Sequence, residues 1–477
     1  MRKQVTITFN NNVIQIGGDI TALEELQEAP SLKVKHPQAY FIRKYMPPGW
    51  DGWMRAVRES GRADPGFFTR IIEYCDNNEI DYEIVDRRVT VPSNIEIPLK
   101  VGKLVPRAYQ VEAVKAVLTN KVGGISYPLG GIKAATNAGK TLMMAMIHKS
   151  VPGAKTIMLL NDGDLFEQFK TEIPELLGDD VGFVRGQKDT GWDASFVVAM
   201  VQTVSRNLNR YKGKLEEFNV VLVDEYDLAA NTTYKKVLKH CWNASVKVGL
   251  SGTVYMGKLA KHKLGHFEIR KFFGEVLFEI TKRELVEKGV STNLVIKIVP
   301  TGNQVSVRGD WKEEYNLNIT ENDRRIQTQL VRMDFNISHN RLPALVMGQF
   351  HDHIHRMYEA FKEAYPKLKV DYVHGDRKGR DIIIEEFRKG EVDILIGSFI
   401  LRRGKNFPLI RYIQQAAGSD SPETISQIMG RGERKHKDKK KTVIDDFFDE
   451  GYYLQRHSKH RINYYKDEGF TVIDLRS

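Results

Sequence analysis

The stretch AATNAGKT at residues 134–141 leads directly into the helical pattern LMMAMIHKS at 142–150. Small residues before a helix let backbone N–H groups close around phosphates, where the helix dipole favours negative charge. Such a loop also needs a lysine for the β- and γ-phosphates and a hydroxyl for Mg²⁺, and Lys140 and Thr141 have the right spacing. Ala134 stands where a first glycine is usual, and Gly-Lys-Thr also occurs in ordinary turns. The stretch therefore predicts a site for ATP and Mg²⁺, and an ordinary turn is the alternative interpretation. Its nucleotide-binding residues would be Thr136, Asn137, Ala138, Gly139, Lys140 and Thr141.

On both sides of this loop, short apolar segments alternate with helical patterns. This alternation is typical of parallel sheets covered by crossover helices. The pattern stops in a polar region around 301–325 and then restarts, which predicts two α/β domains in tandem. The expected strands lie at 156–160, 196–200, 220–223 and 247–251, and then at 342–348, 369–375, 392–398 and 441–447.

The first part of the chain has a different pattern. Val5, Ile7 and Phe9 alternate with threonines before an Asn-rich turn, which predicts a hairpin. Asp64-Pro65 then supplies the start of a helix, and a strand is expected near 82–85. We therefore predict a small α+β domain at residues 1–95, a first α/β domain at 96–300 and a second at 301–477.

Composition limits the class of protein. The chain has 477 residues with 41% hydrophobic and 28% charged residues, which are values for a globular protein. No apolar run is long enough for a membrane span or a signal peptide, and two cysteines are too few for a disulfide framework. A reducing cytoplasm is therefore expected. The net charge is +11, with −1 in residues 1–100, +8 in 101–341 and +4 in 342–477, so a polyanionic partner would bind mainly after residue 100.

An acidic pair follows a wholly apolar segment in VVLVDEYD at 220–227. In a parallel sheet the carboxyl end of a strand is where ligands bind. Nucleotide hydrolysis requires a carboxylate for Mg²⁺ and a second one that orients and deprotonates water, and Asp224 and Glu225 suit these roles. A solvated acidic turn is the simpler alternative for this segment alone.

A third motif lies far downstream, in QIMGRGER at 427–434. Arg431 and Arg434 are three residues apart, so they share a helical face and can reach a γ-phosphate in an opposing domain. Taken alone, this segment is better explained as a basic surface helix. The order of phosphate loop, acidic box, Ser251-Gly252-Thr253 and QxxGRxxR is much more specific, and it resembles the superfamily 2 helicases and translocases.

This resemblance implies two tandem RecA-like parallel-sheet domains after the small α+β domain, and ATP hydrolysis coupled to DNA translocation. It implies catalytic roles for Lys140, Asp224, Glu225, Gln427, Arg431 and Arg434, with Mg²⁺ on Thr141 and Asp224. Arg107 and Gln110 look like the adenine-recognising motif, and Gly404 and Asn406 like further nucleotide contacts. Ser251, Gly252 and Thr253 look like the motif that couples hydrolysis to movement. The DNA contacts implied in the same way are Gln168, Gln202, Thr203, His374, Ser398 and Arg403.

Within the superfamily, the chain most resembles the bacteriophage UvsW-type recombination helicases. The resemblance rests on DEYDLA at 224–229, on WDGW at 50–53 and VDRR at 85–88, and on the closing RINYYKDEGF at 461–470. Asp227 departs from the family box, where histidine is usual. Trp50 and Trp53, with Tyr40, are expected to pack on exposed bases beside Arg55, Arg58 and Arg62, although the tryptophans alternatively fill the small domain's own core.

The resemblance implies an ATP-driven helicase or translocase that remodels branched DNA, such as forks, Holliday junctions or strand-invasion loops, in phage replication and recombination. It further implies a monomer in the host cytoplasm, DNA as partner, phage or host recombination proteins as further partners, and no membrane. Three alternatives remain. An RNA helicase of the DExD kind is disfavoured because such proteins usually have SAT at 251–253 and histidine at 427. The motor of a restriction nuclease would need a nuclease partner, and a non-hydrolysing binding module would be expected to lack Lys140, Glu225 or Arg434.

Overall fold

The computed structural model describes residues 3–89, 91–254, 260–302, 305–375, 377–398, 407–419 and 441–476. The chain divides into two compact units. The first contains residues 1–134 and 139–280, and the second contains 135–138 and 281–477. Among the described residues, no helix combines the length and the apolar character needed to cross a membrane.

The small amino-terminal domain contains a four-stranded mixed sheet in the order β5-β2-β1-β6. β1 pairs antiparallel with β2, as the hairpin prediction requires, and parallel with β6. One face of α3 is buried through Phe68, Ile71, Ile72 and Cys75. The elements are β1 (Gln4–Phe9), β2 (Ile14–Gly18), α1 (Ile20–Glu28), β3 (Lys33–Lys35), α2 (Ala39–Ile42), β4 (Trp53–Arg55), β5 (Arg62–Ala63), α3 (Phe68–Asn77) and β6 (Asp81–Asp86).

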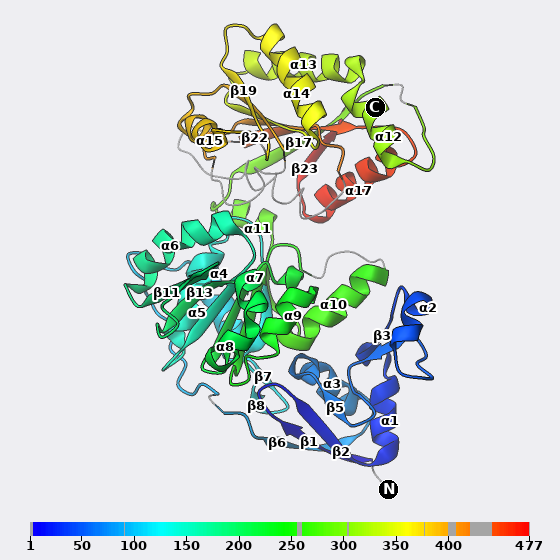
Figure 1. Ribbon diagram of the computed structural model, residues 1–477, viewed down its shortest axis with the longest axis vertical. Coiled ribbons are helices and arrows are strands. Elements are labelled where there is room, and N and C mark those ends of the chain that lie inside the picture. Colours follow the sequence, from blue (N-terminus) through cyan, green and yellow to red (C-terminus); the bar gives the residue numbers. More distant parts are fainter. Residues whose placement is uncertain are drawn as a thin grey trace. The chain divides into compact units, whose positions relative to one another are not determined.

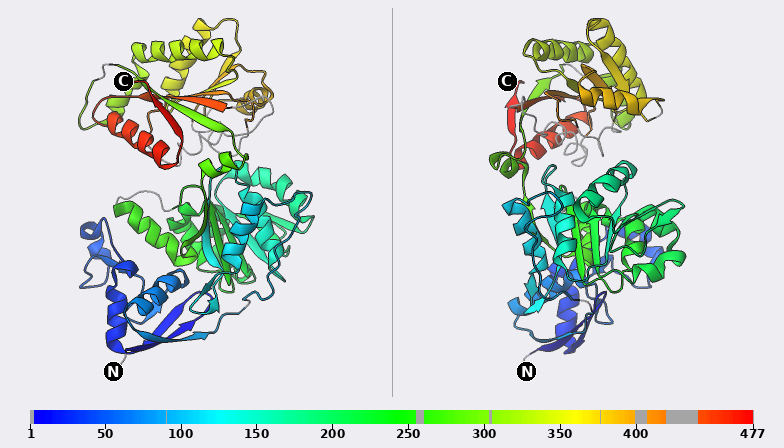
Figure 2. Two further views of the ribbon diagram at one scale, coloured as in Figure 1. Left: turned by 180° about the vertical axis from the view of Figure 1, so that it is seen from behind. Right: turned by 90° about the vertical axis from the view of Figure 1, so that its left-hand side faces the viewer.

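The rest of the first unit is a sheet of eight strands in the order β12-β11-β13-β10-β14-β15-β9-β16. Its neighbouring strands run parallel except for β12. Helices α4, α5 and α6 cover one face, and α7, α8 and α9 cover the other (Figures 1 and 2). Strands β10, β13, β14 and β15 are buried along their whole length, which explains why the sequence shows them as unbroken apolar runs.

The bounds of these elements are as follows. The strands are β7 (Lys121–Val122), β8 (Ile125–Ser126), β9 (Leu129–Ala134), β10 (Thr156–Leu160), β11 (Val181–Arg185), β12 (Lys188–Thr190), β13 (Phe196–Met200), β14 (Val220–Asp224), β15 (Val246–Ser251) and β16 (Val276–Ile280). The helices are α4 (Ala108–Leu118), α5 (Lys140–Ser150), α6 (Gly163–Leu177), α7 (Val201–Arg206), α8 (Leu208–Leu215), α9 (Thr232–Leu238) and α10 (Ala260–Phe273).

The second unit has a seven-stranded parallel sheet in the order β19-β20-β18-β21-β22-β17-β23. Helices α13 and α14 pack against each other on one face of it (Figure 1). The strands are β17 (Asn293–Pro300), β18 (Ala344–Met347), β19 (Val370–Val373), β20 (Ile394–Gly397), β21 (Tyr412–Gln415), β22 (Lys441–Phe448) and β23 (Thr471–Asp474). The helices are α11 (Lys282–Glu287), α12 (Trp311–Tyr315), α13 (Asp323–Ser338), α14 (His351–Ala364), α15 (Arg380–Lys389) and α17 (Leu454–Asp467).

Together the two sheets form a pair of tandem RecA-like domains preceded by a small α+β domain, as predicted. The junction between the motor domains differs from the expected one at 300/301. β17 pairs with β22 along its full length, from Asn293 opposite Lys441 to Pro300 opposite Phe448, so it belongs to the second sheet. The first unit accordingly ends at Ile280.

The small domain and the first motor domain share one hydrophobic core. The cluster around Phe9 and Phe68 includes Tyr127, Leu129 and Phe267 from the motor domain. Polar contacts reinforce the join: Tyr127 Oη donates to Pro65 O at 2.9 Å, and the buried Lys247 Nζ donates to Asn11 O at 3.1 Å. The small domain is therefore fixed to the first motor domain within one unit, which sequence patterning did not indicate.

Candidate nucleotide site

Three neighbouring strands bring the phosphate loop, the acidic box and the motif at 251–253 together. β14, β15 and β9 are adjacent and parallel, so their carboxyl ends meet at one edge of the sheet. β9 leads into the phosphate loop, β14 ends at Asp224, and β15 ends at Ser251. The three motifs are far apart in sequence and form one site because of this strand order.

The phosphate loop has the conformation that its sequence suggests. Gly139 has φ +81° and begins α5, and Asn137 has a left-handed φ of 72°. The positive φ at position 139 favours glycine, and a Cβ there would also come within 2.4 Å of Gln110 Nε2. Both polar atoms of the Asn137 amide are buried and make no hydrogen bond within the described part of the chain. A glycine in the left-handed conformation directly before a helix fits a phosphate-binding loop, because it lets backbone N–H groups face the phosphates.

Lys140 lies between the loop and the acidic box. Its Nζ donates to Glu225 Oε1 at 3.2 Å. Burial alone would lower the pKa of Lys140, but the negative charges of Glu225 and Asp224 outweigh it and raise the pKa above its ordinary value. Lys140 is therefore a permanent cation at the mouth of the phosphate loop.

Asp224 is 6% exposed, at the end of β14. Burial, followed by the charge of Glu225, raises the pKa of its carboxyl group to about 7, while Lys140 acts in the opposite direction. A carboxylate held in such an environment gains from a cation at its side. With the hydroxyl of Thr141 on the first turn of α5, it is a fitting donor for Mg²⁺, because hard cations prefer oxygen ligands.

This pKa shift predicts a pH-dependent gain in stability for Asp224→Asn. An aspartate in the unfolded chain titrates near pH ~3.9. Asp224 therefore keeps its proton to a higher pH in the native state than in the unfolded chain. Ionisation of this carboxyl group lowers the free energy of unfolding as pH rises from about 4 to about 7. Because asparagine does not ionise, Asp224→Asn removes this loss of stability. At pH 8, without nucleotide, the variant should unfold at a temperature higher by at least about 2 °C, and the difference should vanish near pH 4. Differential scanning calorimetry would measure both values. The exposed Asp193→Asn serves as control, and equal gains at both pH values would contradict the account.

The hydroxyl of Ser251 joins the acidic box to the motif at 251–253. Ser251 Oγ lies 2.9 Å from Glu225 Oε2 and 2.8 Å from Asp227 Oδ1, and it accepts the N–H of Thr253 at 3.2 Å. Thr253 Oγ1 lies 3.4 Å from Asp227 Oδ2. Since a serine hydroxyl has one hydrogen to donate, it serves one carboxylate at a time. The motif 251–253 thus contacts the box directly, and Asp227, left out of the predicted site, is part of it.

Tyr226 fixes the acidic box on the sheet. Its side chain is fully buried, and Cβ atoms at Gly131 or Gly249 would come within 1.9 Å of its Oη and 2.2 Å of its Cγ. Glu225 just before it has a positive φ of 51°, a conformation that is uncommon for a residue with a side chain. The Tyr226 ring, packed over these two glycines, therefore stabilises the backbone turn at Glu225. In the sequence, only the glycines in β9 and β15 indicated this role.

The predicted adenine motif lies at the start of α4. Arg107 is exposed and Gln110 is 1% exposed. Gln110 Oε1 accepts the N–H of Arg107 at 2.8 Å, and its Nε2 faces Gly139. Gln110 thus connects the start of α4 to the phosphate loop, and contact with adenine stays a prediction.

The predicted nucleic-acid contacts of the first unit lie near the ends of β10 and β13. Gln168 is exposed on α6 and donates to Glu172 Oε1 at 2.5 Å. Gln202 Nε2 donates to Asn161 O at 3.1 Å, and Thr203 Oγ1 accepts the N–H of Gly186 at 2.9 Å. Gln202 and Thr203 therefore support neighbouring loops.

In the second unit, His374 follows β19 and Ser398 follows β20, at adjacent strand ends. The rings of His374 and His351 are 4.1 Å apart, and Ser398 N donates to Val373 O at 3.2 Å. Six other predicted site residues lie outside the described part of the chain: Arg403, Gly404, Asn406, Gln427, Arg431 and Arg434.

The tryptophans of the small domain contact each other. Trp50 Nε1 donates to Trp53 O at 2.8 Å, and Lys33 Nζ lies 4.9 Å from the centre of a Trp53 ring. Both side chains are half-buried. Arg55 is paired with Asp51 and Glu28, and Arg58 with Asp64. The aromatic rings most open to solvent in this domain are instead Tyr40, Phe41 and Tyr45, with exposed fractions of 88%, 73% and 76%.

Two family models match the chain over segments of the two motor domains. Residues 103–256 match the res subunit of type III restriction enzymes, and residues 327–436 match the helicase conserved C-terminal domain. With the tandem sheets and the motif cluster, these matches define the class: the chain is a superfamily 2 helicase, an enzyme that hydrolyses ATP.

Individual proteins show how far the similarity extends. The ATP-dependent DNA helicase uvsW of enterobacteria phage T4 is 24% identical over 471 residues, covering 89% of this chain and 90% of that protein. Among solved structures, the DNA-bound restriction-modification enzyme LlaBIII has a TM-score of 0.55 at 14% identity and covers 85% of this chain and 34% of its own. RNA-bound Dbp5 of S. cerevisiae has a TM-score of 0.52 at 16% identity, covering 78% of this chain and 90% of its own. The fold is thus common to relatives seen on DNA and on RNA.

Proposed function

We propose that this chain is an ATP-driven DNA translocase that remodels branched DNA, such as forks, Holliday junctions or strand-invasion loops, in phage replication and recombination. The observation that carries the proposal is the attachment of the small domain to the first motor domain through a common core. A branch held by the small domain would keep a fixed position relative to the first motor domain while ATP hydrolysis moves the DNA. Similarity to the phage T4 helicase over nearly the whole chain supports the same reading.

In this proposal the nucleotide site works as follows. Lys140 leaves Glu225 for the β- and γ-phosphates of ATP, so the carboxylate becomes free to orient and deprotonate water. Thr141 and Asp224 would hold Mg²⁺, which would supply charge neutralisation on the phosphate oxygens. Ser251 then exchanges its hydrogen bond between Glu225 and Asp227, which transmits the nucleotide state to the motif at 251–253. The proposal keeps catalytic roles for Gln427, Arg431 and Arg434, which lie outside the described residues.

The surface proposed to recognise the branch is the segment of residues 33–46, which contains β3, α2 and the first part of the loop between β3 and β4. The segment has four cations, Lys33, Lys35, Arg43 and Lys44, and no carboxylate, and Lys33 is paired with Glu28 outside it. The exposed rings of Tyr40, Phe41 and Tyr45 lie on the same segment. Rings that bases stack on, next to cations that contact phosphates, are typical of proteins that bind unpaired nucleotides. We therefore keep Tyr40 from the predicted set and propose Phe41 and Tyr45 in place of Trp50 and Trp53, which contact each other beside this segment.

Replacing the three exposed rings tests this assignment. The variant Tyr40→Ala/Phe41→Ala/Tyr45→Ala should lose at least about fivefold of its preference for a fork over a linear duplex, since base stacking contributes ~1–3 kcal/mol per base. Turnover at saturating linear duplex should stay unchanged, because the nucleotide site is untouched. Leu99→Ala/Val105→Ala removes equally exposed apolar surface and is the control. An undiminished fork preference in the triple variant would refute the role of this segment. Deleting residues 1–95 is less informative because it would uncover Tyr127 and Phe267.

Other observations favour DNA over RNA as the substrate and a translocase over a restriction motor. DNA rather than RNA is favoured by Ser251-Gly252-Thr253, and a restriction motor would need a nuclease from another chain. We further propose that the protein acts as a monomer in the cytoplasm, where its two buried cysteine thiols stay reduced, and that phage or host recombination proteins are its partners.

A further inference from the structure

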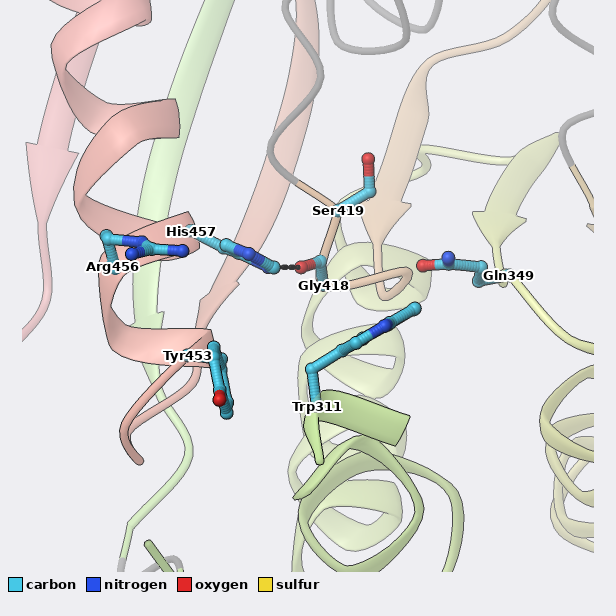
Figure 3. Close-up of a pocket in the computed structure, with 7 residues that line it drawn as sticks. All are labelled: Trp311, Gln349, Gly418, Ser419, Tyr453, Arg456 and His457. Atoms are coloured by element: carbon cyan, nitrogen blue, oxygen red, sulfur yellow. Dashed lines mark hydrogen bonds between the residues drawn. The ribbon is translucent and has the colours of Figure 1, made fainter. Parts of the chain in front are cut away.

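A pocket of ≈ 400 Å³ opens at the carboxyl edge of the second sheet (Figure 3). Gln349 follows β18, Gly418 and Ser419 follow β21, Trp311 begins α12, and the other lining residues come from the start of α17. The lining residues are Trp311, Gln349, Gly418, Ser419, Tyr453, Arg456 and His457. Its volume lies in the range of pockets that hold small organic ligands, ~300–1,000 Å³.

The walls of the pocket are held in place by neighbours. The Trp311 ring lies 6.0 Å from the rings of both Tyr315 and Phe350. Tyr453 Oη accepts the N–H of Gly309 at 3.2 Å, and His457 Nδ1 lies 3.2 Å from Gly418 O. Figure 3 shows the Trp311 ring and the Gln349 amide directed toward the same space, with Tyr453 and His457 on the opposite side. The aromatic walls are therefore largely fixed before any ligand binds, which lowers the cost of binding.

The polar groups of the pocket select the ligand. No lining residue carries a carboxylate. The Gln349 side-chain amide and the Arg456 guanidinium make no hydrogen bond or ion pair with other described residues, so one donor–acceptor group and one cation remain available. A flat heterocycle with hydrogen-bonding edges that carries a phosphate matches these groups: the ring stacks on Trp311, its edge meets Gln349, and the phosphate meets Arg456.

The position of the pocket indicates where such a ligand comes from. In sheet order, the ends of β19, β20, β18 and β21 carry His374, Ser398, Gln349 and Gly418 in succession. His374 and Ser398 are the proposed DNA contacts of this unit. A strand that lies across them would reach Gln349 at the next strand end and Gly418 at the one after that, at about 4.8 Å per strand.

We propose that the Trp311 pocket binds one unstacked nucleotide of a single strand that lies along this edge. The inference rests on the proposed function because it takes the bound strand to be DNA. It adds a base-binding position in the second domain, where contacts would otherwise be to the backbone alone. A free mononucleotide shares the required chemistry and is separated from a DNA strand by the experiment below.

The test uses the full-length protein labelled with 5-fluorotryptophan, which gives one ¹⁹F resonance for each of the 5 tryptophans. The Trp311 signal is assigned from Trp311→Phe. A twelve-residue oligothymidylate should shift this signal, and an abasic oligonucleotide of the same length should not. Thymidine monophosphate should shift it only at far higher concentration. A shift by the mononucleotide at equal or lower concentration would assign the pocket to a free nucleotide and overturn the strand proposal.

Binding measurements give the second readout. Wild-type protein should prefer the oligothymidylate to the abasic strand, and Trp311→Ala should reduce that preference by at least about fivefold, since stacking contributes ~1–3 kcal/mol per base. Trp311→Phe should retain most of it. Trp242→Ala removes an exposed tryptophan of the first unit and serves as control. If the oligothymidylate binds and the Trp311 signal does not move, the pocket inference is wrong and the translocase proposal survives. If neither strand nor duplex binds, the translocase proposal fails as well.

Discussion

Replacing Glu225 with glutamine is expected to lower ATP turnover by about 10²–10⁴-fold, the contribution of a positioned general base, while ATP affinity stays close to that of the wild type. Glutamine preserves the shape of the side chain and its hydrogen bond from Ser251 but cannot accept a proton from water. Steady-state turnover and equilibrium titration with a fluorescent ATP analogue separate the two quantities.

Two further variants sharpen this result. Glu217→Gln makes the same change at a surface ion pair with Lys155 in the same domain, and turnover should not change. Lys140→Ala should instead lose both turnover and affinity, because it removes the cation at the mouth of the phosphate loop. Turnover near the wild-type value in Glu225→Gln would exclude Glu225 as the base and leave Asp227, its partner through Ser251, as the next candidate.

Arg434→Ala is expected to have an effect of similar or larger size, about 10³–10⁵-fold on turnover, if the arginine stabilises charge on the transferred phosphate. Because that charge develops in the transition state, ATP affinity should change little. The measurement is turnover at saturating ATP and DNA, with a nucleotide titration alongside.

The control for this prediction uses the basic run that follows. Lys439→Ala removes one positive charge from RGERKHKDKKK at 431–441. It should weaken DNA binding slightly and reduce its salt dependence without affecting saturated turnover. If Arg434→Ala behaves like Lys439→Ala, the segment is a basic DNA-binding surface and supplies no catalytic arginine.

The sequence predicted four strands of each motor sheet, because buried parallel strands are unbroken apolar runs. The segments around Ile157, Val198, Val221 and Val248 are β10, β13, β14 and β15. The limits of the domains were harder to predict. β17 is also apolar, and only its pairing with β22 assigns it to the second sheet. Such pairing is a long-range contact that periodicity does not encode.

The nucleotide site was predictable where chemistry demands a residue type at a fixed spacing, as for Lys140 and Glu225. It was not predictable where packing sets the role. Tyr226 matters because Gly131 and Gly249 leave room for its ring, and Asp227 matters because β15 places Ser251 beside it. Both depend on neighbouring strands that are distant in sequence.

The same limit applied to the small domain. Trp50 and Trp53 are its most conspicuous aromatic residues, yet they contact each other, whereas Tyr40, Phe41 and Tyr45 face solvent. Exposure depends on the turn of the chain between β3 and β4. Composition alone gives large aromatic residues a burial preference and cannot identify which ones remain outside.

We propose above all that branched DNA stimulates ATP hydrolysis by this chain, because the small domain holds the branch while the motor domains move the DNA. The most direct test is steady-state ATP turnover of the wild-type chain on three substrates of equal nucleotide content: a four-way junction, a linear duplex and an RNA duplex. The account predicts the strongest stimulation by the junction, weaker stimulation by the linear duplex, little by RNA, and a steep loss of apparent DNA affinity as salt rises. Equal stimulation by junction and linear DNA, or stronger stimulation by RNA, would contradict it.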